Sequence, residues 1–156
     1  MRYLQRHEII DAFPKRHRKK VVLPVLLETV RWSDLEFLGW IDIGSARGFM
    51  VMEHHGEMRG LLLSRSSAST SIKRHARMCD LCKTIHGSQG VRLFVAEDTR
   101  NPNRKIGNDF CDDLLCSLRI RHLVAVPPNQ MPETIGMEEK AVRILEGAEQ
   151  FFDQCY

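Results

Sequence analysis

The chain has 156 residues, 43% of them hydrophobic and 28% charged, which is the composition of a globular protein and excludes wholesale disorder. No apolar run approaches the roughly 20 residues of a membrane-spanning helix, and MRYLQRHEIIDAF at the N-terminus has no signal-peptide core. The net charge of +3 is uneven: residues 1–31 hold eight Lys/Arg and three Asp/Glu, so +5, and the remainder holds fifteen and seventeen, so −2.

The first forty residues predict short helices. Apolar positions within 1–13 indicate a helix that Pro14 ends, and the basic run KRHRKK at 15–20 continues as a turn or helix. Residues 21–31 are apolar, and the pattern leaves strand and helix open. WSDLEFLGW at 32–40 favours a one-turn helix that is capped by Ser33 and ended by Gly39.

A small sheet follows. Two apolar runs flank His55-Gly56, a turn in which glycine can adopt positive φ, and together they predict a hairpin. The predicted strands are 41–43, 49–53 and 58–63. The polar tract SRSSASTS at 64–71 has no apolar periodicity and indicates a connector.

The second half predicts a hairpin and two helices. Val91–Glu97 alternates as a strand does, and Ile106–Phe110 is its return strand after the turn-rich TRNPNRKIG. A helix starts within CDDLLCSLRIR, and PPNQMPET at 127–134 is a second linker. Met137–Tyr156 carries apolar residues at steps of three and four, which predicts an amphipathic helix.

Four of the five cysteines lie in two short pieces, CDLC at 79–82 and CDDLLC at 111–116. We expect a cytoplasmic protein. In the reducing cytoplasm, paired cysteines are more often metal ligands or redox groups than disulfides. A Cys-x2-Cys turn brings both sulfurs to one side. A second pair, with one cysteine ending a strand and the other in the first turn of a helix, completes a tetrahedral zinc site. The spacing predicts one structural Zn²⁺ in a treble-clef finger over 74–124, with the ligands Cys79, Cys82, Cys111 and Cys116.

Alternatives for these cysteines stay open. The first pair alone would make a redox dithiol, although no βαβ pattern precedes it. His86 would replace one cysteine ligand, although we expect this histidine on the surface of the Cys-x2-Cys turn, which we call the knuckle. Cys155, on the apolar side of the last helix, favours a small core residue over a reactive thiol. Four thiolates leave no position for a substrate, and their charge would be offset by the cations Arg77, Lys83, Arg119 and Arg121.

Four stretches closely resemble the FBP-type treble-clef zinc-finger family, the C-terminal domain of the FusB-type proteins. They are LEFLGWID, RGFMVMEHHGEMRGLLL, MCDLCKTIHGSQGVRLFVAE and DFCDDLLCSLRIR. The resemblance implies an α+β fold with a small antiparallel or mixed sheet, a treble-clef finger and a C-terminal amphipathic helix. We expect an N-terminal basic helix with a small α/β portion in 1–73, and the finger with the last helix in 74–156, as one FBP-like unit.

The resemblance also implies a function. Members of this family bind elongation factor G through the zinc finger and promote its release from the ribosome, which protects against fusidic acid. We therefore expect a non-enzymatic, zinc-stabilised binding protein whose partner is elongation factor G, without a small-molecule substrate or a membrane partner. The longer members carry an N-terminal helical bundle, for which 156 residues leave no room, so drug protection is not carried over.

The basic residues indicate an alternative function, in which the protein is a ribosome- or RNA-binding factor. Phosphate contacts would come from Lys15, Arg16, Arg18, Lys19 and Lys20. A solvated basic face is the simpler interpretation of that run. A loop on a rigid scaffold is also a natural contact site. The candidate partner contacts there are Arg100, Arg104 and Lys105, with Phe94 and Phe152 as aromatic anchors unless both rings are core.

Catalytic machinery is not indicated. Asp112-Asp113 favours helix N-terminal charges over an acid/base pair. EHHGE at 53–57 offers metal-ligating side chains, but polar residues are expected at a hairpin turn in any case. The sequence has no glycine-rich phosphate loop and no motif that activates a serine.

Overall fold

The computed structural model describes residues 1–24, 27–42, 44–66, 76–87, 89–128 and 130–156. Its main sheet has five strands in the order β1-β2-β3-β6-β7, each antiparallel to its neighbours. The strands of this sheet are β1 (Leu38–Asp42), β2 (Arg47–His54), β3 (Glu57–Arg65), β6 (Val91–Glu97) and β7 (Lys105–Cys111). A separate two-stranded sheet is formed by β4 (Arg77–Met78) and β5 (Ile85–His86).

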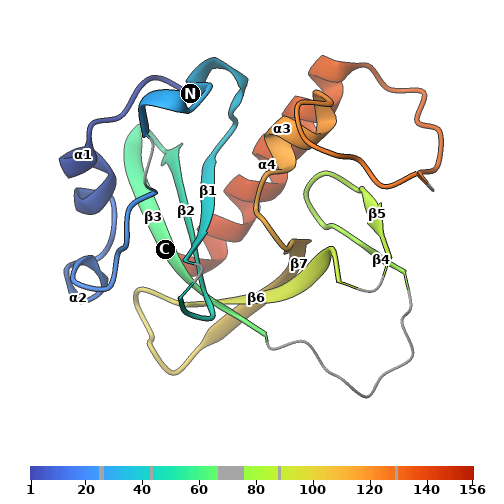
Figure 1. Ribbon diagram of the computed structural model, residues 1–156. Coiled ribbons are helices and arrows are strands. Elements are labelled where there is room, and N and C mark those ends of the chain that lie inside the picture. Colours follow the sequence, from blue (N-terminus) through green and yellow to red (C-terminus); the bar gives the residue numbers. More distant parts are fainter. Residues whose placement is uncertain (25–26, 43, 67–75, 88, 129) are drawn as a thin grey trace.

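The helices lie on both faces of the first three strands (Figure 1). They are α1 (Arg6–Asp11), α2 (Lys15–Arg18), α3 (Cys116–Ile120) and α4 (Met137–Cys155), with the 3-10 helices η1 (Leu27–Thr29) and η2 (Trp32–Asp34). The N-terminal helices cover one face, and α4 crosses the other (Figure 1). The fold is therefore α+β, as predicted.

Strand β2 lies between the two layers. Phe49 and Val51 face the N-terminal core, whereas Met50 and Met52 face the α4 core, and all four are fully buried. A strand that is buried on both faces shows a continuous apolar run instead of alternation, which is what FMVM displays. The predicted hairpin is confirmed, and His55 and Gly56 at its turn have φ of 51° and 78°.

The N-terminal core is aromatic. The ring of Phe13 meets Trp40 and Phe49 edge-on, with centroids 6.3 and 6.0 Å apart, and Trp40 stacks on Phe49 at 5.0 Å. Such pairs add to the burial energy of the rings. Phe13 follows α1, so this contact anchors the first helix just before Pro14, where the sequence predicts its end.

The second core forms under α4. Its buried residues recur at steps of three and four and confirm the predicted amphipathic helix; they are Ile144, Ala148, Phe151, Phe152 and Cys155. Phe151 meets Phe110 of β7 edge-on at 5.1 Å. Cys155 is fully buried, in agreement with the predicted core position. Among the described residues, no helix has the length and apolarity to cross a membrane.

Four expectations need correction or fall outside the described residues. In 21–31 the described part contains η1 and irregular chain, because the segment follows the surface of the N-terminal core instead of pairing with the sheet. Gly39 does not end a helix but lies within β1. Ser64 and Arg65 of the polar tract extend β3. Residues 67–75 lie outside the described chain, as does the boundary at 73/74, so the division into 1–73 and 74–156 remains a prediction.

Candidate metal centre

The four predicted cysteines converge. Their Sγ atoms all lie within 4.8 Å of one another, and all four residues are buried. The Sγ atoms of Cys79 and Cys116 are 3.6 Å apart, and those of Cys82 and Cys111 are 3.4 Å apart. Tetrahedral zinc with bonds of about 2.3 Å has sulfur–sulfur edges of about 3.8 Å, so the cluster is close to that size. All five cysteines are described, and each is a free thiol.

The first pair forms a tight knuckle between β4 and β5. The Cys79 amide donates to the Thr84 carbonyl and the Lys83 amide to the Cys79 carbonyl, both at 3.0 Å. Lys83 has φ of 57°, which reverses the chain and places both sulfurs on one side. The Thr84 hydroxyl oxygen lies 3.2 Å from the Cys82 Sγ. This geometry agrees with the predicted Cys-x2-Cys turn.

The second pair joins a strand to a helix. Cys111 ends β7 and Cys116 begins α3, as expected from their spacing. Between them Leu114 has φ of 57°, and the Leu115 amide donates to the Asp113 carboxylate at 3.0 Å. A five-residue separation would place two side chains on different faces of one helix. The loop removes that difficulty by turning the strand end and the helix start toward the same point.

The electrostatics of the cluster favour a divalent cation. Hydrogen bonds from the other thiols, Cys111 first, lower the pKa of Cys82. Hydrogen bonds with Cys111 and Cys79 and complete burial raise the pKa of Cys116. Neighbouring buried thiols therefore cannot all lose their protons unless a cation offsets part of the negative charge. A bound Zn²⁺ offsets two of the four negative charges, and the donor set fits one structural zinc ion with no open position.

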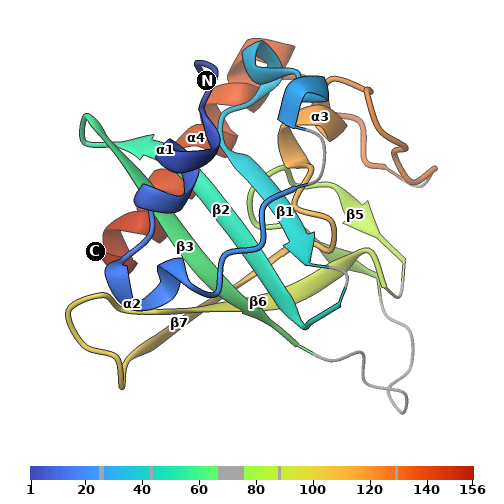
Figure 2. The same ribbon diagram turned by 60° about the vertical axis from the view of Figure 1, so that its left-hand side comes forward.

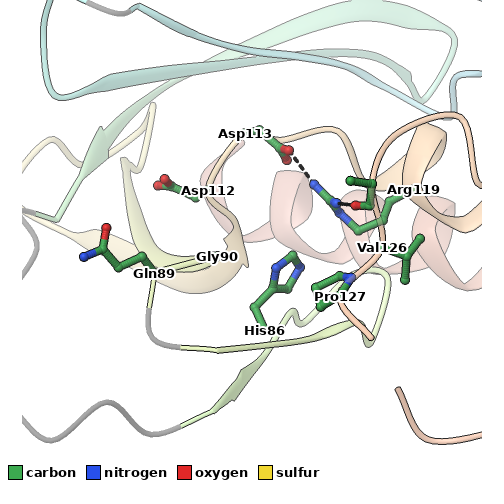
Figure 3. A pocket seen from close by; sticks show the side chains of 9 residues that line it. His86, Gln89, Gly90, Asp112, Asp113, Arg119, Val126 and Pro127 are labelled. Atoms are coloured by element: carbon green, nitrogen blue, oxygen red, sulfur yellow. Dashed lines mark hydrogen bonds and ion pairs between the residues drawn. The ribbon is translucent and has the colours of Figure 1, made fainter. Parts of the chain in front are cut away.

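His86 is buried beside the cysteine cluster and does not lie on the surface of the Cys-x2-Cys turn. It is 7% exposed, and its Nε2 is 3.4 Å from the Cys111 Sγ. The expected surface position is therefore wrong. The reason is the close approach of Gly90, where a β-carbon would come within 2.1 Å of the His86 ring. Figure 3 shows the imidazole facing the pocket that Gly90 and Arg119 also line. An N–H donor at this place stabilises a thiolate.

The cations around the site differ from the expected set. Arg119 is buried, binds the Asp113 carboxylate and the Ala125 carbonyl, and interacts with the charge of Cys111. Arg77 instead pairs with Asp109, and Arg121 pairs with Glu36 at 2.6 Å. The ion-pair partners of these two arginines are therefore carboxylates.

Sequence reasoning missed Arg143 of α4. Its guanidinium donates to the Cys82 carbonyl at 3.1 Å and pairs with Glu133 at 2.8 Å. No local pattern marks this arginine, because it reaches the knuckle only through the packing of α4. The contact ties the last helix to the metal-binding turn.

The adjacent aspartates have separate structural tasks. Asp113 accepts from the start of α3, as expected of a helix N-terminal charge. Asp112 instead pairs with Arg65 of β3 and, at 3.3 Å, with Arg92 of β6. Its expected place as a helix charge is therefore wrong, since both arginines come from the sheet.

The two candidate aromatic anchors are buried. Phe94 and Phe152 have no exposed surface. Phe94 packs against Phe110 with centroids 6.1 Å apart, and Phe152 packs against Tyr156 at 6.2 Å. A ring without exposed surface cannot anchor a partner, so this part of the partner-site prediction is corrected. Both rings belong to the core.

The basic segments predicted separately lie side by side, with α2 against the loop between β6 and β7 (Figure 2). The Arg16 guanidinium donates to the carbonyls of Asp98 and Thr99 at 3.3 and 3.4 Å. Arg100 and Arg104 are exposed and pair with the buried Asp98 at 3.3 and 3.4 Å. The exposed lysines that flank these arginines are Lys15, Lys19, Lys20 and Lys105. We call the following set the basic face: Lys15, Arg16, Lys19, Lys20, Arg100, Arg104 and Lys105. Arg18, by contrast, pairs with Asp11 at 2.8 Å.

The five-stranded sheet, the buried four-cysteine cluster and α4 define an α+β protein with a treble-clef zinc site. The model of the FBP C-terminal treble-clef zinc-finger family matches residues 6–155, so the chain belongs to this family. No curated protein matches the chain.

Among solved structures, the fusidic acid resistance protein FusC is similar, with a TM-score of 0.64 and 15% identity. The likeness covers 100% of this chain and 60% of FusC. At this identity it shows a shared fold, and this chain corresponds to about 60% of the length of FusC.

Proposed function

We propose that this protein is a zinc-stabilised binding protein, not an enzyme, that engages elongation factor G in the cytoplasm and modulates its release from the ribosome. The observation that carries the proposal is family membership over residues 6–155. The buried cluster supports it, because it provides the family's ligand pattern. We assign the zinc ligands to Cys79, Cys82, Cys111 and Cys116.

The β6–β7 loop is a suitable contact surface for such a partner. The loop is the tip of the β6–β7 hairpin, where Glu97 pairs with Lys105, and Cys111 lies at the opposite end of the same two strands. The Thr99 amide donates to the Cys155 carbonyl at 2.7 Å, and the Asp98 carboxylate accepts from the Arg100 amide at 2.8 Å. A loop that is ordered before binding loses less conformational entropy when a partner docks.

A titration of the zinc-loaded protein against elongation factor G tests the proposal. We expect saturable binding to the free factor, with ribosomes alone as the comparison. The double variant Arg100→Gln and Arg104→Gln should weaken it, whereas exposed Arg6→Gln on α1 is the matched control. Absence of binding to the factor at low and high salt would overturn the proposal.

A second candidate, ribosome or RNA binding, is favoured by one observation. Arg16 joins α2 to the β6–β7 loop and so unites the basic face. Phosphate contacts give a binding constant that falls with salt. The test is the triple variant Lys15→Gln, Lys19→Gln and Lys20→Gln, which leaves the structural contacts of Arg16 and Arg18 intact. Salt-sensitive ribosome binding that this variant loses would support the candidate, and unchanged binding at low salt would exclude it.

FusC is a fusidic acid resistance protein, and we do not propose that activity for this chain. This chain corresponds to 60% of FusC, and a shared fold at 15% identity does not transfer an activity.

A further inference from the structure

A second group of metal-ligating side chains lies outside the cysteine cluster. The ligand atoms of His54, His55 and Asp153 are within 4.8 Å of one another. The Nε2 atoms of His54 and His55 lie 2.8 and 3.0 Å from the same oxygen, Oδ1 of Asp153. The histidines come from the β2–β3 turn and the aspartate from the last turn of α4, so only the folded chain brings them together.

The backbone turns both rings to the same side. Neighbouring residues of a strand normally point to opposite faces of the sheet. Here the positive φ of His55 and Gly56 forms a two-residue hairpin turn, and the two imidazole centroids are 4.1 Å apart. Asn, Asp and Gly are preferred at the first position of such a turn. The turn also tolerates histidine, but a single imidazole would be enough to tie the hairpin to α4.

We propose that His54, His55 and Asp153 form a second metal site, for a divalent transition cation such as Ni²⁺, Co²⁺ or Zn²⁺. Two imidazole nitrogens and one carboxylate oxygen suit these borderline ions. Bonds of about 2.1 Å at right angles give ligand–ligand edges of about 3.0 Å. The two nitrogen–oxygen distances of 2.8 and 3.0 Å are already of that size.

The site is open on one side and fixed on the other. The His54 side chain is 5% exposed, and its ring is packed against Phe152 and Tyr156 at 5.7 and 6.3 Å. The side chains of His55 and Asp153 are 78% and 53% exposed. An ion can therefore enter from solvent and keep water in its remaining positions.

Local charge permits a cation. The Asp153 carboxylate supplies a negative charge, and the imidazoles of His54 and His55 both lie within hydrogen-bond distance of it. Arg59 lies over the ring of Tyr156, at 4.7 Å, but its own partner is Glu57 at 2.6 Å. The carboxylate of Asp153 thus stays with the two histidines. An ion bound to all three would link the hairpin tip to the end of α4.

Calorimetric titration of the zinc-loaded protein with NiCl₂ tests the site. We expect one equivalent of Ni²⁺ in addition to the zinc, without zinc release. His55→Asn keeps a residue suited to the turn and removes one ligand, and Asp153→Asn keeps the shape and removes the charge. Each should weaken Ni²⁺ binding roughly tenfold or more. His7→Asn, a change of an exposed histidine on α1, is the matched control and should bind as the unmodified chain does.

Two further readouts separate this site from the cysteines. A nitrogen–oxygen donor set gives weak Ni²⁺ or Co²⁺ absorption, whereas thiolate ligation adds intense charge-transfer bands. Ni²⁺ should also raise the melting temperature of the unmodified chain and not that of His55→Asn. Failure to bind Ni²⁺, or equal binding by the unmodified chain, His55→Asn and Asp153→Asn, would overturn the proposal, as would thiolate bands in the nickel-loaded protein.

Discussion

Leu114 packs directly on Gly39: a β-carbon at Gly39 would lie 2.6 Å from the Leu114 carbonyl oxygen and 2.8 Å from its Cβ. Gly39 belongs to β1, an edge strand of the main sheet, and Leu114 belongs to the loop between Cys111 and Cys116. The missing side chain therefore lets the metal-binding loop sit against the sheet. This close approach explains a glycine in the middle of a strand.

The Gly39→Ala variant should be less stable than the unmodified chain. The added methyl group meets backbone atoms that cannot move aside without displacing the loop, and overpacking of this kind costs about 1–3 kcal/mol. Urea unfolding of the zinc-loaded proteins measures the difference in the free energy of unfolding. Gly44→Ala is the control, because its β-carbon would meet only Asp42 Oδ1 at an ordinary 3.6 Å. Equal stability of Gly39→Ala and the unmodified chain would contradict the packing argument.

Removal of zinc should unfold the cysteine-bearing half of the protein. Four buried sulfurs that share no cation repel one another when ionised, and structural zinc contributes on the order of 10 kcal/mol in zinc fingers. We expect a chelator in mild urea to abolish the dispersed amide spectrum of residues 79–121. Cys79→Ser should purify without stoichiometric zinc, and Cys155→Ser, outside the cluster, should retain it. A metal-free chain with its native spectrum would show that the cluster does not need the ion.

The sequence was informative where the signal is local. The steps of three and four in 137–156 follow from helix geometry, and the hairpin follows from an apolar run on each side of His55-Gly56. The two cysteine pairs likewise encode their own turns, since each spacing defines a short loop. The structure confirms these elements and brings the four sulfurs together.

The rest depends on contacts between distant residues. Arg143 reaches the Cys82 carbonyl and Asp153 reaches His54 only because α4 packs across the sheet. The sequence around Gly39 predicts the end of a helix, because no residue of that segment indicates that the loop containing Leu114 packs on this glycine. Residues 21–31 have apolar composition without a period, so neither strand nor helix could be preferred.

In the native protein no thiol should react with a chromogenic disulfide reagent. Burial raises the pKa of Cys155 to about 12, so at pH 8 this residue is almost wholly the unreactive thiol. Bound zinc protects the other four. We expect all five to react after denaturation in the presence of a chelator. A redox dithiol at Cys79 and Cys82 would instead give two fast-reacting thiols in the native protein, and that result would contradict the structural zinc site.

Stability should fall between neutral and mildly acidic pH, in part because of His17. Burial, followed by the charge of Arg16, lowers the pKa of this imidazole, although Glu97 opposes the shift. Its Nε2 accepts the Arg16 Nε–H at 3.3 Å, which requires the neutral ring. The unfolded chain binds a proton near pH 6.5, whereas the folded chain binds it only at lower pH. The contribution of His17 is therefore complete above about pH 6.5 and is lost as pH falls through the folded pKa.

Urea unfolding at pH 7.5 and pH 5.5 measures this contribution. The free energy of unfolding of the unmodified chain should drop more between these two values than that of His17→Gln, which cannot take up the proton. Acid also weakens zinc binding by thiolates, but that loss is common to both proteins and cancels in the difference. The exposed-site control His7→Gln should follow the unmodified chain. Parallel pH profiles for His17→Gln and the unmodified chain would show that the buried imidazole does not control acid stability.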